Sequence, residues 1–157
     1  MMGRPAFLGR DGEWYVVLQV VLVVAAFLIP PAGSWLSSGT GWHLLAYTLG
    51  AFSVLMIGLG LRALGSSFAA VPRLREDGRL VQEGIYRVVR HPIYGGLILA
   101  LLGWAVWQNS LRHLALAGAL LVVLEAKVRR EERYLAERFP QYPDYRRRTR
   151  KFFHWIY

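Results

Sequence analysis

The stretch WYVVLQVVLVVAAFLIPPAGSWLSSGTGWHLLAYTLGAFSVLMIGLGL, residues 14–61, contains no Asp, Glu, Lys or Arg. A transmembrane helix needs about 20 mostly apolar residues, so this stretch is long enough for two. Turn-forming residues at 30–34 and 37–41 interrupt it near the middle. We therefore expect a helical hairpin with membrane spans at about 14–29 and 42–61.

A second stretch without charged residues, 93–111, extends this pattern. Together with the apolar residues after it, it predicts spans at about 93–107 and 111–124, separated by the polar break 108–110. Both are short, so helix tilt, snorkelling or local thinning of the bilayer is expected. The sequence thus predicts an all-α membrane protein with about four transmembrane helices in a single membrane domain, residues 1–157.

The basic residues fall almost entirely on one side of these predicted spans. The chain has 19 Lys and Arg residues and a net charge of +9. Two of the basic residues lie in 1–13, six in 62–92 and ten after 126, whereas the loop 30–41 has none and the remaining one is Arg112. By the positive-inside rule, this distribution predicts that both termini are cytoplasmic.

A signal peptide is an alternative interpretation of the first span. However, Asp11 and Glu13 precede it, where a signal peptide carries positive charge. Its apolar part is also long for a signal peptide. A retained membrane anchor is therefore expected.

The composition argues against two kinds of partner, nucleic acid and metal. The basic run 146–151 could bind phosphates, but the aromatic residues within 152–157 favour a membrane-surface segment. The absence of Cys excludes disulfides, a Cys nucleophile and thiolate metal sites. No pair among the four His residues has metal-ligand spacing. We therefore expect a membrane as partner, without nucleic acid or metal.

Two polar segments on the predicted cytoplasmic side, 73–96 and 127–152, hold the residues that could carry chemistry. The two spans between them cross the bilayer outward and back, with a rise of about 1.5 Å per residue in each direction. This geometry predicts that His91 and Glu131 face each other at the cytoplasmic mouth of the last helical hairpin.

The residues after His91 predict a helix start that could hold a ligand. Pro92 is suited to the first turn of a helix, whose free N–H groups attract anions. The glycines at 95–96 would let a ligand approach the backbone closely. Tyr86 and Tyr94 offer aromatic faces for a base or a cation.

A plainer interpretation assigns no chemistry to these segments. In it, His91 is an interfacial helix cap, and Glu131 and Glu132 only neutralise their basic neighbours. The residues alone leave both interpretations open.

With both segments in view, the chain resembles the isoprenylcysteine carboxyl methyltransferase family and its phospholipid N-methyltransferase relatives. The resemblance covers roughly residues 61–152. The residues that carry it are Gly84, Ile85, Tyr86, Arg90, His91, Pro92, Ile93, Tyr94, Gly95, Glu131, Glu132, Leu135, Phe139, Tyr142 and Tyr145.

The resemblance implies a multi-span membrane enzyme that uses S-adenosylmethionine without a Rossmann-type fold. It implies that the cofactor pocket is lined by Leu80, Val81, Tyr86, His91, Pro92, Ile93, Tyr94 and Glu131. Lys127 falls where prenylcysteine enzymes have a substrate-contacting Arg, and this departure brings a prenylcysteine substrate into question. The acceptor is thus an isoprenylcysteine-type carboxylate or a lipid amine, and no catalytic residue is assigned. The excess of Arg over Lys favours a prokaryotic plasma membrane over the endoplasmic reticulum.

Two other functions remain as alternatives. The chain is also similar to NADPH-dependent steroid and sterol reductases, which share an Arg-x-Pro-x-Tyr segment. The adjacent carboxylates at 131–132 favour the methyltransferase, because the reductases typically have a lone Asp there. A non-enzymatic membrane subunit would explain the basic tail, but not why Tyr86, His91, Tyr94 and Glu131 occur together.

Overall fold

The computed structural model describes residues 13–35, 41–65 and 80–153. Within these ranges the chain is helical, with one isolated parallel bridge between Val89 and Arg150 and no strand. The elements are α1 (Glu13–Leu28), α2 (Gly41–Leu64), the short 3-10 helix η3 (Gly84–Arg87), α3 (Pro92–Trp107), α4 (Leu111–Arg138) and α5 (Tyr142–Arg148). The predicted all-α fold class is confirmed for this part of the chain.

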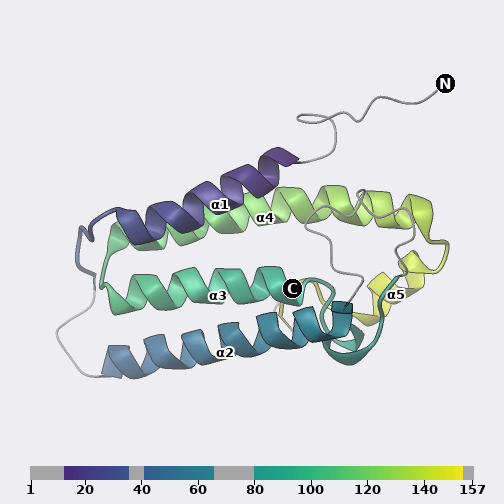
Figure 1. Cartoon of the computed structure of the whole chain (residues 1–157), viewed down its shortest axis with the longest axis horizontal. Coiled ribbons are helices and arrows are strands. Elements are labelled where there is room, and N and C mark those ends of the chain that lie inside the picture. Colours follow the sequence, from purple (N-terminus) through teal and green to yellow (C-terminus); the bar gives the residue numbers. More distant parts are fainter. Residues whose placement is uncertain (1–12, 36–40, 66–79, 154–157) are drawn as a thin grey trace.

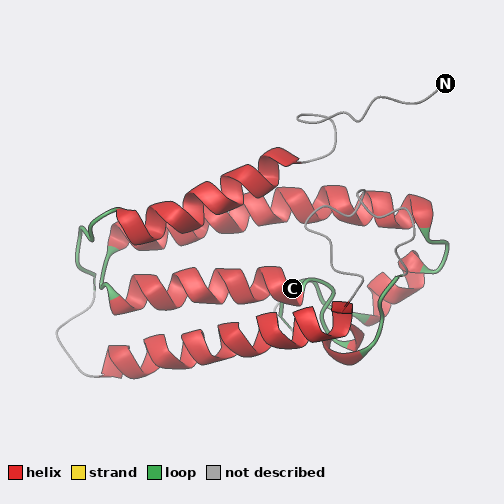
Figure 2. Ribbon diagram, viewed as in Figure 1, coloured by secondary structure: helices red, strands yellow, loops and turns green. Residues whose placement is uncertain are grey.

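The four long helices lie side by side and alternate in direction (Figure 1). Helix α3 packs between α2 and α4, and α1 packs on α4. The ends of α2 and α4 and the starts of α1 and α3 gather at one end of the bundle, together with η3 and α5. Figure 2 shows the helices and their loops in the same view.

Three of the predicted spans agree with helices to within a few residues. The fourth helix, α4, continues well past the predicted end at 124 and stops only at Arg138. Lys127 and Glu131 therefore lie on the same unbroken helix as the apolar residues that precede them.

The helices leave many large apolar side chains uncovered. Leu28 is 77% exposed, Leu44 70% and Val54 73%. By length and composition, α2 is the described helix that could cross a membrane, while α1 and α3 are apolar but shorter. Extended apolar surface of this kind is unusual on a soluble protein and suits contact with lipid.

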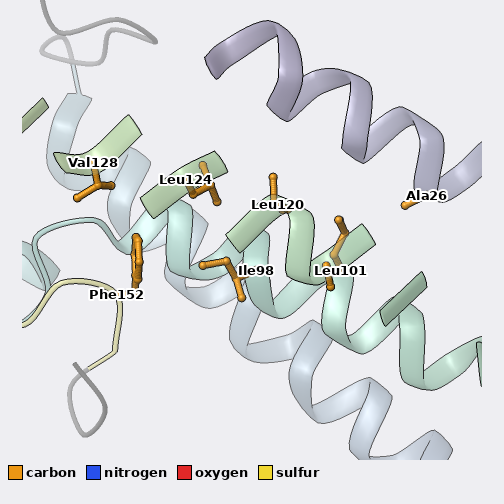
Figure 3. Packing of buried hydrophobic residues seen from close by; sticks show 8 residues of the cluster. Ala26, Ile98, Leu101, Leu120, Leu124, Val128 and Phe152 are labelled. Carbon is orange, nitrogen blue, oxygen red and sulfur yellow. The ribbon is translucent and has the colours of Figure 1, made fainter. Parts of the chain in front are cut away.

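The buried core lies between α3 and α4 (Figure 3). Ile98 and Leu101 of α3 pack against Leu120 and Leu124 of α4, and Ala26 of α1 covers one end of the cluster. Phe152, after α5, covers the other end, so the carboxyl-terminal segment is part of the core rather than an appendage.

Hydrogen bonds join the loop after α1 to the turn between α3 and α4. The hydroxyl of Ser110 accepts from the Ala32 N–H at 3.0 Å and donates to the Ala32 carbonyl. The Leu111 N–H donates to the Gly33 carbonyl at 2.7 Å. Gly33 and Asn109 both have positive φ, as the tight turns require. These bonds hold α1 against the α3–α4 hairpin at the end opposite η3 and α5.

Candidate functional site

The start of α3 is fixed by backbone pairing with the carboxyl-terminal segment. Pro92 occupies the first turn of α3 and His91 is its N-cap residue, which confirms the predicted helix start. The N–H groups of Arg90 and His91 donate to the carbonyls of Arg150 and Lys151, at 2.8 and 3.0 Å. Residues far apart in sequence therefore determine where the His91 side chain lies.

His91, Tyr94 and Glu131 form one buried cluster. The Tyr94 hydroxyl donates a 2.7 Å hydrogen bond to Glu131 Oε1. The His91 ring stacks on the Tyr94 ring, with centroids 5.6 Å apart and planes 7° from parallel, and His91 Nδ1 lies 3.8 Å from Glu131 Oε2. The prediction that His91 and Glu131 face each other is confirmed.

Lys127 completes this cluster from one turn earlier on α4. Its Nζ lies 4.0 Å from Glu131 Oε1 and 4.6 Å from the centroid of the Tyr94 ring. It also donates a 3.2 Å hydrogen bond to Oε1 of Gln19 on α1. Burial lowers the pKa of Lys127, and the negative charge of Glu131 opposes that change. The cluster therefore already holds one cation between an aromatic face and a carboxylate.

Glu132, the neighbour of Glu131, makes a second cluster that the sequence interpretation missed. Its Oε1 lies 2.9 Å from Arg90 Nε and 3.3 Å from His91 Nε2, and its Oε2 lies 3.4 Å from Arg146 Nε. The Arg90 guanidinium donates further hydrogen bonds to the carbonyls of Thr149 and Arg146. His91 thus lies between two carboxylates, one on each of its ring nitrogens.

The two adjacent carboxylates have opposite pKa shifts. Burial raises the pKa of Glu131, although His91, Lys127 and Tyr94 act against it. Burial alone would also raise the pKa of Glu132, but hydrogen bonds from His91 and Arg90 hold it at about 2. The hydrogen bonds from His91 and Arg90 thus favour the charged form of Glu132, whereas burial disfavours the charged form of Glu131.

The remaining predicted pocket residues lie in η3, just before it, or at the start of α3. Tyr86 is buried in η3, and its carbonyl accepts a 2.8 Å hydrogen bond from the Tyr145 hydroxyl. Pro92 and Ile93 pack on α2, where a Cβ on Gly60 would meet Ile93 Cγ1 at 2.8 Å. Leu80 and Val81 are half-buried ahead of η3, and residues 73–79 of the first motif segment lie outside the described ranges.

The glycines after Tyr94 have a different role from the predicted one. A Cβ on Gly95 would meet the Phe152 carbonyl at 2.8 Å, and one on Gly96 would meet Ile57 Cγ1 at 2.5 Å. The prediction that they admit a ligand to the backbone is wrong, because the carboxyl-terminal segment and α2 occupy that space.

Other polar residues are engaged in structural contacts. Arg129 Nε lies 2.9 Å from Glu125 Oε1, as the i,i+4 spacing predicts, and Lys151 Nζ lies 2.8 Å from the same oxygen. Among the residues described, no group of three or more His, Asp or Glu side chains could hold a metal ion.

The paired motif, in which His91 and Tyr94 of one segment face Glu131 of the other, lies within a stretch that matches a family of methyltransferases by sequence. The sequence profile of the phospholipid methyltransferase family matches residues 41–142, and the chain belongs to this family. The match includes every residue of the two clusters except Gln19, Arg146 and Thr149.

Three relatives show the range of the similarity. The cobalt-zinc-cadmium resistance protein CzcN of Cupriavidus metallidurans is 36% identical over 146 residues, 92% of this chain and 63% of that protein. Protein-S-isoprenylcysteine O-methyltransferase B of Arabidopsis thaliana is 33% identical over 89 residues, 54% of this chain and 45% of that protein. Methanethiol S-methyltransferase 2 of Bradyrhizobium diazoefficiens is 30% identical over 170 residues, 95% and 65% of the two chains. The chain spans less than two thirds of the length of each of these relatives.

Proposed function

We propose that the chain is an integral membrane methyltransferase that moves a methyl group from S-adenosylmethionine to a lipophilic acceptor. The observation that carries the proposal is the buried Glu131 carboxylate, hydrogen-bonded by Tyr94 and facing His91, within the stretch that matches the family. The family match and the methyltransferases among the relatives favour this function over the NADPH-dependent reductase.

The residues of the cluster suit the chemistry of S-adenosylmethionine. Lys127 shows that an aromatic face and a carboxylate accommodate a cation here, and the cofactor carries a sulfonium and an ammonium group. Glu131 would accept hydrogen bonds from the ribose hydroxyls or the amino group, while His91 and the start of α3 would face the carboxylate. Tyr86, together with Leu80, Val81, Pro92 and Ile93, would supply the apolar part of the pocket.

When bound, the cofactor supplies an activated methyl group. The displacement needs an in-line approach of the acceptor, so the main task of these side chains is positioning. We assign that task to the cofactor-binding cluster and assign acceptor contact to Lys127. Both roles are part of the proposal.

We further propose four membrane spans, with both termini and the site on the cytoplasmic side. The exposed apolar side chains of α1 and α2 support this topology, as does the position of the two clusters at one end of the bundle. The cofactor would then arrive from the cytosol and the acceptor from the bilayer. The bacterial relatives favour a prokaryotic plasma membrane.

Ligand binding in detergent tests the proposal. S-adenosylhomocysteine should raise the thermal unfolding midpoint and NADPH should not, because only a ligand of the native state stabilises it. Combining His91→Ala with Glu131→Gln should weaken S-adenosylhomocysteine binding at least tenfold, whereas Arg147→Ala, in an exposed ion pair, should not. Full affinity in the double variant would contradict the site, and stabilisation by NADPH alone would contradict the function.

A further inference from the structure

Gln19 is a polar side chain within the apolar helix α1. The residues around it are aliphatic, and Val20 beside it is 52% exposed on the outer surface. Gln19 is half-buried and turned inward, where its Oε1 accepts the 3.2 Å hydrogen bond from Lys127. A glutamine within an apolar membrane helix is costly unless its amide makes a polar contact. The contact that the structure shows is the hydrogen bond with Lys127.

Within the described part of the chain, the Lys127 ammonium makes fewer hydrogen bonds than it has donors. Its side chain is 7% exposed and its ammonium has three donors. Among the described residues, it makes one hydrogen bond, to Gln19, an ion pair with Glu131 at the longer distance of 4.0 Å, and a contact with the Tyr94 ring, 4.6 Å from its centroid. Glu131 is also engaged by the Tyr94 hydroxyl. A buried ammonium with donors to spare is stabilised by a further anion, which points to a ligand group that is negatively charged.

The Gln19–Lys127 pair lies between α1 and α4, and the proposed function brings the acceptor to the site from the bilayer. Near Ala26, α1 lies close against the α3–α4 hairpin, and toward its beginning it diverges from α4 (Figures 1 and 3). Gln19, near the middle of α1, is joined to Lys127 of α4 by a 3.2 Å hydrogen bond. This pair lies on the α1 side of the Tyr94–Glu131 cluster.

We infer that Gln19 and Lys127 together form an acceptor subsite that selects a nucleophile reacting as an anion, a carboxylate or a thiolate, over an amine. This inference rests on the proposed methyltransferase function and names its substrate class. Lys127 would pair with the charge of the acceptor, and the amide N–H₂ of Gln19 would donate to the same group.

The charge balance of the transfer explains the selection. The bond from sulfur to the methyl carbon breaks and its electron pair stays on sulfur, which becomes a neutral thioether. A lone pair of the anion forms the new bond to that carbon, so the two opposite charges disappear. A carboxylate has no proton to lose, and a thiol releases its proton to water before the transfer. Lys127 keeps its proton throughout. An amine acceptor would instead become a cation beside the Lys127 ammonium and would have to lose a proton.

An acceptor panel tests the substrate class. The full chain in nanodiscs, with radiolabelled S-adenosylmethionine, is offered a prenylcysteine analogue, a long-chain alkanethiol and phosphatidylethanolamine. We expect label on the carboxylate or the thiol, and the two arms identify which. Label on phosphatidylethanolamine would overturn the inference. So would protein that binds S-adenosylhomocysteine but labels neither the prenylcysteine analogue nor the alkanethiol. Wild-type protein that does not bind S-adenosylhomocysteine would instead overturn the proposed function.

Three variants of α1 test the role of Gln19. Gln19→Leu should raise the acceptor KM about tenfold, with kcat and S-adenosylhomocysteine affinity unchanged. Gln19→Glu should keep or raise the thermal midpoint, because a carboxylate strengthens the contact with Lys127, yet it should raise the acceptor KM further by repelling an anion. Val20→Leu, on the exposed face, is the matched control and should change neither quantity. A wild-type acceptor KM in both Gln19 variants would show that the residue is only structural and would overturn the inference.

Discussion

Arg90 and Glu132, 42 residues apart in sequence, form a buried ion pair in which Nε lies 2.9 Å from Oε1. The same guanidinium donates to two carbonyls of the carboxyl-terminal segment, so it connects the start of α3, the end of α4 and the residues after α5. His91, next to Arg90, is held by the same carboxylate. The pair therefore sets the position of the imidazole that faces Glu131.

Replacing Arg90 should destabilise the protein strongly. Arg90→Ala leaves the Glu132 carboxylate buried with one partner fewer and the Thr149 carbonyl without its donor, so a loss of about 3–5 kcal/mol is expected. Arg147→Ala is the matched control, because Arg147 and Asp144 are both largely exposed and should contribute almost nothing. Chemical denaturation in detergent measures both. Equal, small losses in the two variants would contradict the anchoring role of Arg90.

The opposite pKa shifts of the two glutamates should appear as opposite pH dependences of stability. The pKa of Glu132 is about 2 in the fold against an ordinary 4.5, so its stabilising contribution is complete above pH 4.5 and lost as the pH falls toward 2. The stability advantage of wild type over Glu132→Gln should therefore shrink over that range.

For Glu131 the raised pKa gives the reverse sign. Wild type should gain stability relative to Glu131→Gln as the pH falls through the raised pKa, because the fold disfavours the charged form. Thermal midpoints of the three proteins across pH measure both trends. The same sign in both comparisons would show that the environments of the two carboxylates are not distinct.

Removing the Tyr94 hydroxyl should separate the contribution of its hydrogen bond to Glu131 from that of the ring contact with Lys127. Tyr94→Phe keeps an aromatic face beneath Lys127 but leaves Glu131 without its 2.7 Å hydrogen bond. We expect a stability loss of about 1–3 kcal/mol and weaker S-adenosylhomocysteine binding. Tyr47→Phe, on an exposed part of α2, is the control and should change neither quantity. Calorimetry and thermal unfolding of the two variants make the comparison, and unchanged values for Tyr94→Phe would contradict the role of the hydroxyl.

Adding a methyl group at Gly95 should displace the carboxyl-terminal segment that fixes the start of α3. In Gly95→Ala the new Cβ would lie 2.8 Å from the Phe152 carbonyl, so the carboxyl-terminal segment must move, at a cost of about 1–3 kcal/mol. Gly118→Ala on α4 meets nothing within 4 Å and should be neutral or stabilising by up to about 1 kcal/mol. If both substitutions gave the same midpoint, the close approach at Gly95 would be refuted.

The bundle was largely predictable from the sequence because charge-free stretches and turn residues mark where helices begin and end. The exception is the end of α4. The predicted span ends at Leu124 because hydropathy falls after this residue. The helix itself continues, because its backbone hydrogen bonds do not depend on the polarity of the side chains. The first proline after Leu111 is Pro140, and the helix continues almost to it.

The site was predictable only in part. Spacing across the last hairpin placed His91 opposite Glu131, since both lie near the ends of adjacent antiparallel helices. The partners of Glu132 could not be inferred from helical spacing, because Arg146 reaches it from α5 and Arg90 is placed by backbone pairing with the carboxyl-terminal segment. Side chains at consecutive helical positions point about 100° apart. The adjacent residues Glu131 and Glu132 therefore indicated that each carboxylate has its own set of partners.

The backbone pairing of Arg90 and His91 with Arg150 and Lys151 has a consequence for biosynthesis. A nascent chain that has reached the end of α4 already contains all four long helices. It still lacks the backbone partners of Arg90 and His91, the Phe152 side chain over the core, and one ion-pair partner of Glu132. The four helices can therefore form before these partners exist, whereas the site is complete only when the carboxyl-terminal segment has folded back onto the start of α3.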